Sequence, residues 1–328
     1  MTCFDDLSTD LLLNIFTYLT YTEIFQTFFG LKKCLNDAIR DYPIHIDLSK
    51  IMNCLNAQQF PLKCRSIVLT GLNLPSFQMK YSYLNLTSLR VVTFKKMDLI
   101  TLHSFIEKLP MKQLESITVE YFTWHYYPID AYKQIWSIIM NSINGNCLRY
   151  LHLPYHIRYW NIEKNSYYFS NLKYAILDYI SVSQMLTFMS YSPNLHRFKA
   201  FIDGPNKDIF RYIIILSKLN HLTLNLQDEW TFEEIQQLLT ICPYLKHLIL
   251  KLKIQREMKN MFEPISWQTL IDNKLPYLTF LRLHFDYIID YSDKNFYNFQ
   301  ETFNHDEYWL QQQPHFQVTI NIIQQEVL

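Results

Sequence analysis

Apolar residues return along most of the chain in one short pattern, in which an apolar residue is followed by others three and five positions later. In "LKHLIL", Leu245, Leu248 and Leu250 fill these positions. Nine such segments begin at Cys64, Leu89, Leu114, Leu148, Leu172, Leu195, Leu219, Leu245 and Leu278. The intervals between them are 25, 25, 34, 24, 23, 24, 26 and 33 residues, so most lie between 23 and 26. This near-constant interval predicts a structural repeat.

The segments that connect these apolar patterns have the spacing of amphipathic helices. In "FEEIQQLLTICPYL", apolar residues recur at helical intervals, and Thr231 stands where an N-cap residue is expected. Residues 130–143 have a similar spacing. A strand with alternating burial and a helical return of similar length is the unit that stacks into a solenoid with one parallel sheet. An ordinary doubly wound sheet is the alternative, although its loops rarely keep so constant a period.

Residues 61–328 resemble leucine-rich repeats of about 24 to 26 residues, roughly nine to ten in number. The resemblance implies an α/β fold, a horseshoe whose parallel sheet lines the concave face. The family usually places asparagine or cysteine three residues after the third leucine-type position. Here other residues replace it, namely Leu72, Met97, Phe122, His156, Ile180, Asp203, Gln227, Lys253 and Asp286. Because that amide ladder satisfies turn backbone groups, its absence predicts an irregular horseshoe.

The first 45 residues lack the repeat and predict three short helices. The first follows Ser8 as N-cap and carries an apolar stripe of Leu11, Leu12, Ile15, Phe16 and Leu19. The second starts after Thr22 and ends near Gly30, and the third spans about Cys34 to Ile39. Residues 46–60 then form a linker and cap, and the alternating "IHIDL" from Ile44 predicts the first strand of the solenoid.

This N-terminal segment resembles the F-box, whose consensus begins Leu-Pro-x-Glu-Ile-Leu and continues through Ile-Phe-x-Tyr-Leu to an Asp-Leu pair. The matching residues are Leu7, Asp10, Leu11, Leu12, Ile15, Phe16, Tyr18, Leu19, Glu23 and Ile24. The sequence departs at Ser8, where the family has proline, and a serine can cap the helix that proline would start. The resemblance implies binding to a Skp adaptor through Leu7, Ser8, Leu11, Leu12, Ile15, Phe16, Leu19 and Ile24.

An F-box followed by leucine-rich repeats implies the substrate receptor of a Skp-cullin-F-box ubiquitin ligase. Such a receptor is not an enzyme, since the ubiquitin chemistry belongs to other chains. Two other functions stay open. The chain could be a repeat scaffold whose N-terminal helices only cap the fold. It could also be a receptor for a small molecule, which only the abundance of aromatic residues supports.

Composition narrows the function classes further. Thirty basic and 30 acidic residues give no net charge, so nothing global draws the chain to nucleic acid or to a membrane surface. The six cysteines are widely spread without a CxxC pair, which favours reduced thiols in the cytoplasm or nucleus. The N-terminus lacks the basic and small-residue features of a secretory signal, and no apolar run approaches the roughly 20 residues of a membrane span.

Motifs that carry catalysis or bind cofactors are not found in the sequence. The four glycines, at 30, 71, 145 and 204, cannot form GxGxxG or a P-loop, and HExxH and GxSxG do not occur. His152 and His156 have the spacing of helical metal ligands, but Pro154 and the strand pattern separate their directions. We therefore expect no catalytic residues, no cofactor and no metal.

Strand alternation identifies one candidate binding surface. If the second and third residues of each apolar pattern point into the core, the residues beside them point outward. In the middle and late repeats these are cationic, imidazole or aromatic, and the target-binding candidates are Tyr150, His152, Tyr174, Arg197, Lys199, His221, His247 and Arg282. We therefore expect this face to bind a target protein through an acidic or phosphorylated segment.

Overall fold

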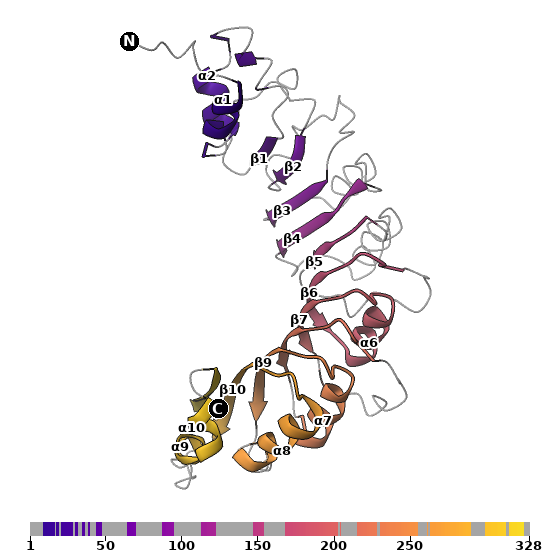
Figure 1. Cartoon of the computed structure of the whole chain (residues 1–328), viewed down its shortest axis with the longest axis vertical. Coiled ribbons are helices and arrows are strands. Elements are labelled where there is room, and N and C mark those ends of the chain that lie inside the picture. The colour runs from indigo at the N-terminus through magenta and orange to yellow at the C-terminus, as the bar shows by residue number, and fades with distance from the viewer. Residues whose placement is uncertain are drawn as a thin grey trace. The chain divides into compact units, whose positions relative to one another are not determined.

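A computed structural model gives the fold of the chain in two compact units, Met1–Leu153 and Pro154–Leu328, which we describe separately (Figure 1). The structure describes residues 9–16, 18–19, 21–28, 30–31, 35–36, 39, 44–47, 64–69, 87–94, 113–122, 147–153, 168–202, 204, 215–227, 230–254, 261, 263–289, 299–312 and 315–324. The helix expected at 130–143 lies outside these residues.

The first unit begins with two short helices, α1 (Thr9–Phe16) and α2 (Tyr21–Phe28). The rings of Phe16 and Phe28 are 5.4 Å apart between their helices, and Ile24 is buried with them. After α2, Gly30 takes a positive φ of 85°, the left-handed conformation with which many helices end. Leu35 and Ile39, from the third segment expected here, are also buried.

The described residues of the first unit also contain five strands: β1 (Ile44–Asp47), β2 (Cys64–Leu69), β3 (Ser88–Phe94), β4 (Ser116–Phe122) and β5 (Tyr150–Leu153). Each strand pairs in parallel with the next strand in the chain. Because they are parallel, all five strands start from the same end of the sheet. β1 is the first strand expected from the alternation that starts at Ile44.

One predicted register in this unit is wrong. The apolar pattern that we began at Leu89 would pair Val92 with Ile67, whereas in the structure Leu89 pairs with Ile67 and with Ile117. The stretch "LNLTSLRVVTF" fits the pattern from Leu86 as well as from Leu89, and the structure uses the earlier start.

In the part of the second unit that the structure describes, six strands also pair in parallel and in chain order, as an open sheet. They are β6 (Tyr174–Ile180), β7 (Arg197–Ile202), β8 (His221–Leu226), β9 (His247–Ile254), β10 (Phe280–Ile289) and β11 (Phe316–Gln324). Here the predicted register is confirmed: Leu222 pairs with Leu248, and Leu248 with Leu281. The predicted α/β class with a parallel sheet therefore holds.

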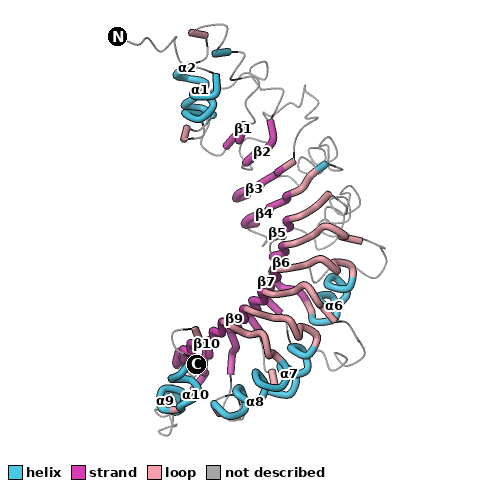
Figure 2. Tube along the Cα trace, viewed as in Figure 1, coloured by secondary structure: helices cyan, strands magenta, loops and turns pink. Residues whose placement is uncertain are grey.

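Helices cover one face of this second sheet. They are α6 (Val182–Ser190), α7 (Phe232–Thr240) and α8 (Pro264–Lys274), followed by α9 (Phe299–His305) and α10 (Glu307–Gln312) before β11. Figure 2 shows α6, α7 and α8 on the same side of the strands. The ring centres of Phe188 on α6 and Phe198 on β7 are 6.2 Å apart. Those of Trp267 on α8 and Phe285 on β10 are 6.3 Å apart.

The start of α7 follows the sequence prediction. Thr231 accepts a hydrogen bond from the backbone N–H of Glu234, and the Glu234 side chain accepts one from the backbone N–H of Thr231. Ser181 and Gln184 make the same reciprocal capping box at α6. Both boxes satisfy N–H groups that a helix start leaves without a backbone partner.

The turn before each strand also repeats. In five successive coils, the first residue of the apolar pattern donates its backbone N–H to the carbonyl oxygen three residues earlier, over 2.9 to 3.3 Å. These residues are Leu172, Leu195, Leu219, Leu245 and Leu278. On the same rim, Lys218 donates to the Asn194 side chain and Asn194 donates to the Ser170 carbonyl, each bond joining neighbouring coils. These side-chain hydrogen bonds thus link the turns of neighbouring coils.

Candidate functional site

The face of the second sheet opposite the helices carries the candidate site. Burial alternates along its strands, so Leu222, Leu224 and Leu226 are buried whereas the residues between them are partly exposed. We call the outward residues of β6 to β11 the polar face. Its members include Tyr174, Ile176, Asp178, Arg197, Lys199, Phe201, His221, Thr223, Asn225, His247, Ile249, Lys251, Lys253, Phe280, Arg282, His284, Asp286, Gln317, Thr319 and Asn321.

A row of rings crosses the polar face near the start of the strands. Tyr174, Arg197, His221, His247 and Phe280 stand in register on β6 to β10. The Arg197 guanidinium lies 5.5 Å from the centre of the Tyr174 ring. The two imidazoles stack at 4.1 Å with an angle of 13° between their planes, and the Phe280 ring lies 5.6 Å from His247. The row therefore contains two sets of packed flat groups, Arg197 on Tyr174 and the rings of His221, His247 and Phe280.

The environment of this row keeps its imidazoles neutral. Partial burial, then the charges of His247, Arg197 and Lys246, lowers the pKa of His221 to about 4. Burial and the same two cations lower the pKa of His247 as well. The imidazoles are therefore uncharged at neutral pH, although cationic side chains surround them.

The next row along the strands carries more cationic side chains. Lys199 on β7 is exposed. Arg282 lies on β10, two residues after Phe280, which ends the row of rings. The Arg282 Nε donates to the Gln317 Oε1 at 3.1 Å, and its guanidinium lies 5.5 Å from the Phe280 ring centre. These contacts hold the Arg282 plane in one orientation on the face.

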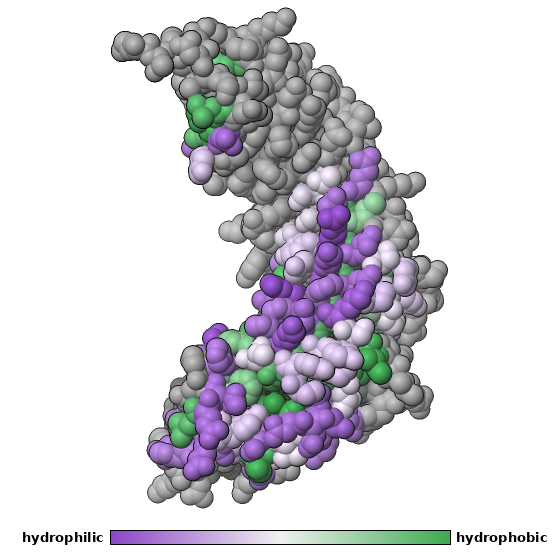
Figure 3. All heavy atoms as spheres, in the orientation of Figure 1, coloured by the Kyte–Doolittle hydropathy of each residue, from purple (hydrophilic) through white to green (hydrophobic). Residues whose placement is uncertain are grey.

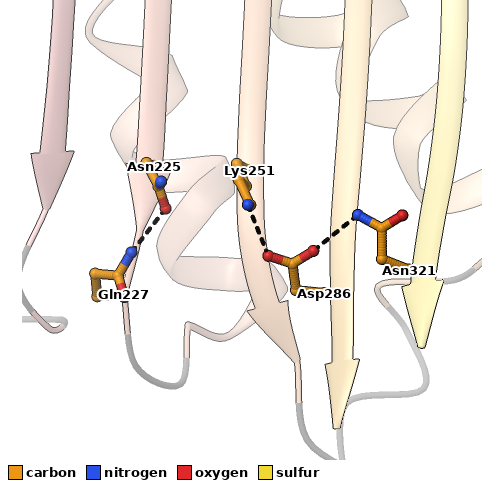
Figure 4. Close-up of polar contacts among 5 residues, drawn as sticks. All are labelled: Asn225, Gln227, Lys251, Asp286 and Asn321. Carbon is orange, nitrogen blue, oxygen red and sulfur yellow. Dashed lines mark hydrogen bonds and ion pairs between the residues drawn. The ribbon is translucent and has the colours of Figure 1, made fainter. Parts of the chain in front are cut away.

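An acidic side chain interrupts the cationic face further along the strands, as Figure 4 shows. The Lys251 Nζ lies 2.9 Å from the Asp286 Oδ2, and the Asn321 Nδ2 donates to the Asp286 Oδ1 at 3.0 Å. Although burial opposes ionisation of Asp286, the hydrogen bonds from Asn321 and Lys251 outweigh it and lower the pKa of this carboxyl group. Asn225 and Gln227 form a separate hydrogen bond at 2.8 Å.

The polar face is predominantly cationic. Its described residues include the cations Arg197, Lys199, Lys251, Lys253 and Arg282, against the carboxylates Asp178 and Asp286. Within the described part of the chain, no carboxylate lies within ion-pair distance of Arg197 or Lys199. A chain with no net charge therefore concentrates positive charge on this face.

Six of the eight predicted target-binding residues lie together on this face, namely Tyr174, Arg197, Lys199, His221, His247 and Arg282. The other two, Tyr150 and His152, lie on β5 of the first unit, in register with Ser116 and Thr118. His156, considered with His152 as a metal ligand, lies outside the described residues. We assign the candidate site to the second unit alone.

Sequence reasoning missed two residues and one ion pair that contribute to the face. Phe280 precedes the buried Leu281 as His247 precedes Leu248, so the repeat alignment could have placed it in the same row. Lys246 acts on the imidazoles from the turn before β9, and no periodic signal marks it. The ion pair of Lys251 with Asp286 joins residues that are not directly opposite on β9 and β10, so it could be found only from the structure.

The predicted adaptor-binding residues divide between the interior and the surface of the first unit. Phe16 and Ile24 are buried, so in this structure they support the helical core. Leu11 is 47% exposed and Tyr18 is 89% exposed, with the half-buried Ile15 between them and Leu19 half-buried after them. The side chains of Leu7, Ser8 and Leu12 are outside the described set. Hydrophobic side chains gather over these helices in Figure 3.

Comparison of the sequence with models of known protein families gives no match, and comparison with curated proteins gives none. In the described residues, no group of three or more His, Cys, Asp or Glu side chains is placed to hold a metal ion. None of the helices described has the length and apolar character that a membrane crossing requires. Cys147 and Cys242 carry free thiols.

Proposed function

We propose that this protein is a non-enzymatic substrate receptor of a Skp-cullin-F-box ubiquitin ligase. In this proposal the N-terminal helices are an F-box that binds a Skp-type adaptor, and the strands and their helical returns are leucine-rich repeats that hold a target protein. The receptor works in the cytoplasm or nucleus, where it brings the target to the ubiquitin-loading subunits.

The observation that carries the proposal is a sheet with two unlike faces. One face of β6 to β11 is buried under α6, α7 and α8, while the polar face holds ordered aromatic and cationic groups without a covering helix in the described residues. Interfaces draw much of their binding energy from a few arginine and aromatic anchors. A broad sheet face with such anchors suits a macromolecular partner.

The N-terminal helices support the adaptor half of the proposal. Leu11, Ile15 and Tyr18 follow one another at intervals of four and three residues, so they lie along one stripe of α1 and its last turn. Leu31 after α2 is 63% exposed as well. Apolar groups that stay accessible on so small a helical pair favour a partner that covers them.

A binding assay with a purified Skp-type adaptor tests this function. We expect the full chain to bind the adaptor and the Leu11→Asp plus Ile15→Asp variant to lose binding, because both charges would be buried without partners at the interface. Thr27→Ala, an exposed change on α2, serves as a control that should bind normally. Circular dichroism must show that all three proteins are folded. A folded wild-type chain that does not bind the adaptor refutes the ligase proposal.

The burial of Phe16 and Ile24 favours a second candidate, in which the N-terminal helices only cap the repeats. The protein would then be a scaffold for protein contacts that recruits no ligase. The same assay separates the two candidates, because a scaffold would keep its target while failing to bind the adaptor.

A further inference from the structure

The cationic groups of the polar face are spread out and do not converge on one point. Arg197 and Lys199 are two residues apart on β7, about 7 Å along the strand. Arg282 lies on β10, three strands away, which is about 14 Å across the sheet. A single phosphate group, only a few ångströms across, cannot reach both ends of this arrangement. A chain with several carboxylates at intervals can contact all of them.

The stacked imidazoles lie between these cations and respond to what binds there. His221 faces Arg197 of β7 on one side and His247 and Lys246 of β9 on the other, and His247 faces Phe280 of β10. The neighbours named here are cationic, imidazole or aromatic, so the free face disfavours imidazolium. A carboxylate placed over the stack would reverse this balance and favour protonation.

Taking the receptor proposal as its basis, we propose that the polar face of β6 to β11 binds an extended Asp/Glu-rich polypeptide segment across Arg197, the His221–His247 stack and Arg282, and that binding takes up protons at the imidazoles. The partner is therefore a protein with an acidic segment. Its carboxylates pair with the guanidinium and ammonium groups, and the aromatic rings at Tyr174 and Phe280 line the two ends of the row.

Proton uptake gives the binding a distinctive pH dependence. Asp and Glu carboxyls stay ionised above about pH 5, so the charge of the segment does not change between pH 8 and 6. The imidazoles are neutral in the free protein, and the bound carboxylates raise their pKa values. Because the complex binds more protons than the separated partners, affinity must rise as the pH falls.

Fluorescence anisotropy with the full chain and a labelled peptide of about 12 residues, half of them Glu and Asp, tests the proposal. We expect saturable binding that strengthens about 2- to 4-fold from pH 8 to pH 6. Arg197→Ala plus Lys199→Ala should weaken it about 10- to 100-fold, since each lost contact is charge-assisted. Lys218→Ala plus Lys274→Ala removes two exposed cations outside the face and should have little effect.

Two further arms complete the test. His221→Gln plus His247→Gln should keep the affinity measured at pH 8 and lose the rise at lower pH. The same peptide with Gln and Asn in place of its acids should not bind.

The proposal is overturned if the acidic peptide does not bind, if the two double-alanine variants weaken binding equally, or if the pH profile stays flat. Binding only of a peptide with phosphoserine in place of its acidic residues would also overturn it. None of these arms involves the adaptor, so peptide binding without adaptor binding would refute the ligase proposal alone. Adaptor binding without peptide binding would refute this inference alone.

Discussion

Replacing Leu222 by alanine should destabilise the second unit far more than replacing Thr223, its neighbour on the same strand. Leu222 is 2% exposed and pairs across strands with Leu248, which is 1% exposed. Removing a buried leucine side chain costs about 2 to 5 kcal/mol, since it forfeits the transfer free energy and leaves a cavity. Thr223 points to the polar face, where its replacement should cost less than about 1 kcal/mol.

The partner strand repeats the comparison. Leu248→Ala should lose about 2 to 5 kcal/mol, whereas Ile249→Ala, on the polar face, should lose much less. Because Leu222 and Leu248 are in register, the double variant should depart from additivity by about 0.5 kcal/mol or more. Thr223→Ala combined with Leu248→Ala is the matched control, because these residues lie on opposite faces.

Urea unfolding followed by tryptophan fluorescence measures these differences. Trp230, Trp267 and Trp309 are all buried in the second unit, so their emission reports on its unfolding. The midpoint should fall for both buried-face variants while the slope with urea stays constant. Equal losses at Leu222 and Thr223, or a loss below about 1 kcal/mol at Leu222, would refute the assigned faces and with them the polar face.

Two more variants test local contacts. Thr231→Ala removes the capping box of α7 and should lower the free energy of unfolding in urea by about 1 kcal/mol, with Thr240→Ala, at the other end of the helix, as a milder control. Asp286→Asn should destabilise the unit by about 1 kcal/mol at pH 7, since solvent screening at the half-exposed Lys251 limits the ion pair. The pKa of Asp286 is lowered in the folded protein, so its contribution is present above its ordinary pKa and is lost as pH falls through the folded value. Urea unfolding at pH 7 and below pH 3 should show that the stability difference between the wild type and Asp286→Asn vanishes at low pH. An equal stability difference at both pH values would contradict the assigned ion pair.

The second sheet was predictable because the apolar patterns chosen there begin at leucines that close a turn, and the structure pairs the strands in that register. A leucine precedes each of β6 to β10 by two positions, as at Leu195 and Leu245. Period-2 burial then assigns every side chain to a face, which is why Arg197 and His221 could be placed from sequence. Once the start of the apolar pattern is placed correctly, alternation assigns every other residue of that strand to its face.

The errors arose where local pattern and pairing disagree. Around β3, leucines at 86 and 89 offer two starts three residues apart, and only pairing with β2 and β4 chooses between them. In β6 the register shifts between Leu177 and Ile180, where Tyr179 takes a positive φ of 51°. Tyrosine gives no sequence signal for that conformation, which usually favours glycine. The stack of Tyr179 on Phe201 at 5.3 Å follows from this bend and was not predicted.

The candidate site was predictable in its residues and not in its contacts. Outward positions could be listed from alternation, yet the distances that define the site depend on how neighbouring strands are offset. His221 and His247 stack because both precede a buried leucine by one residue in paired strands. On α1 the apolar stripe did not reveal which side faces the interior, so Phe16 was counted with accessible residues although it is buried.

Simultaneous binding of both partners tests the receptor account most directly. The full chain, a Skp-type adaptor and the labelled acidic peptide should elute from size-exclusion chromatography as one complex, with the mass measured by light scattering. The account predicts that the adaptor leaves the peptide affinity unchanged and that Leu11→Asp plus Ile15→Asp removes only the adaptor from the complex. If the adaptor and the peptide exclude one another, or if the folded chain holds neither, the protein is not the receptor proposed.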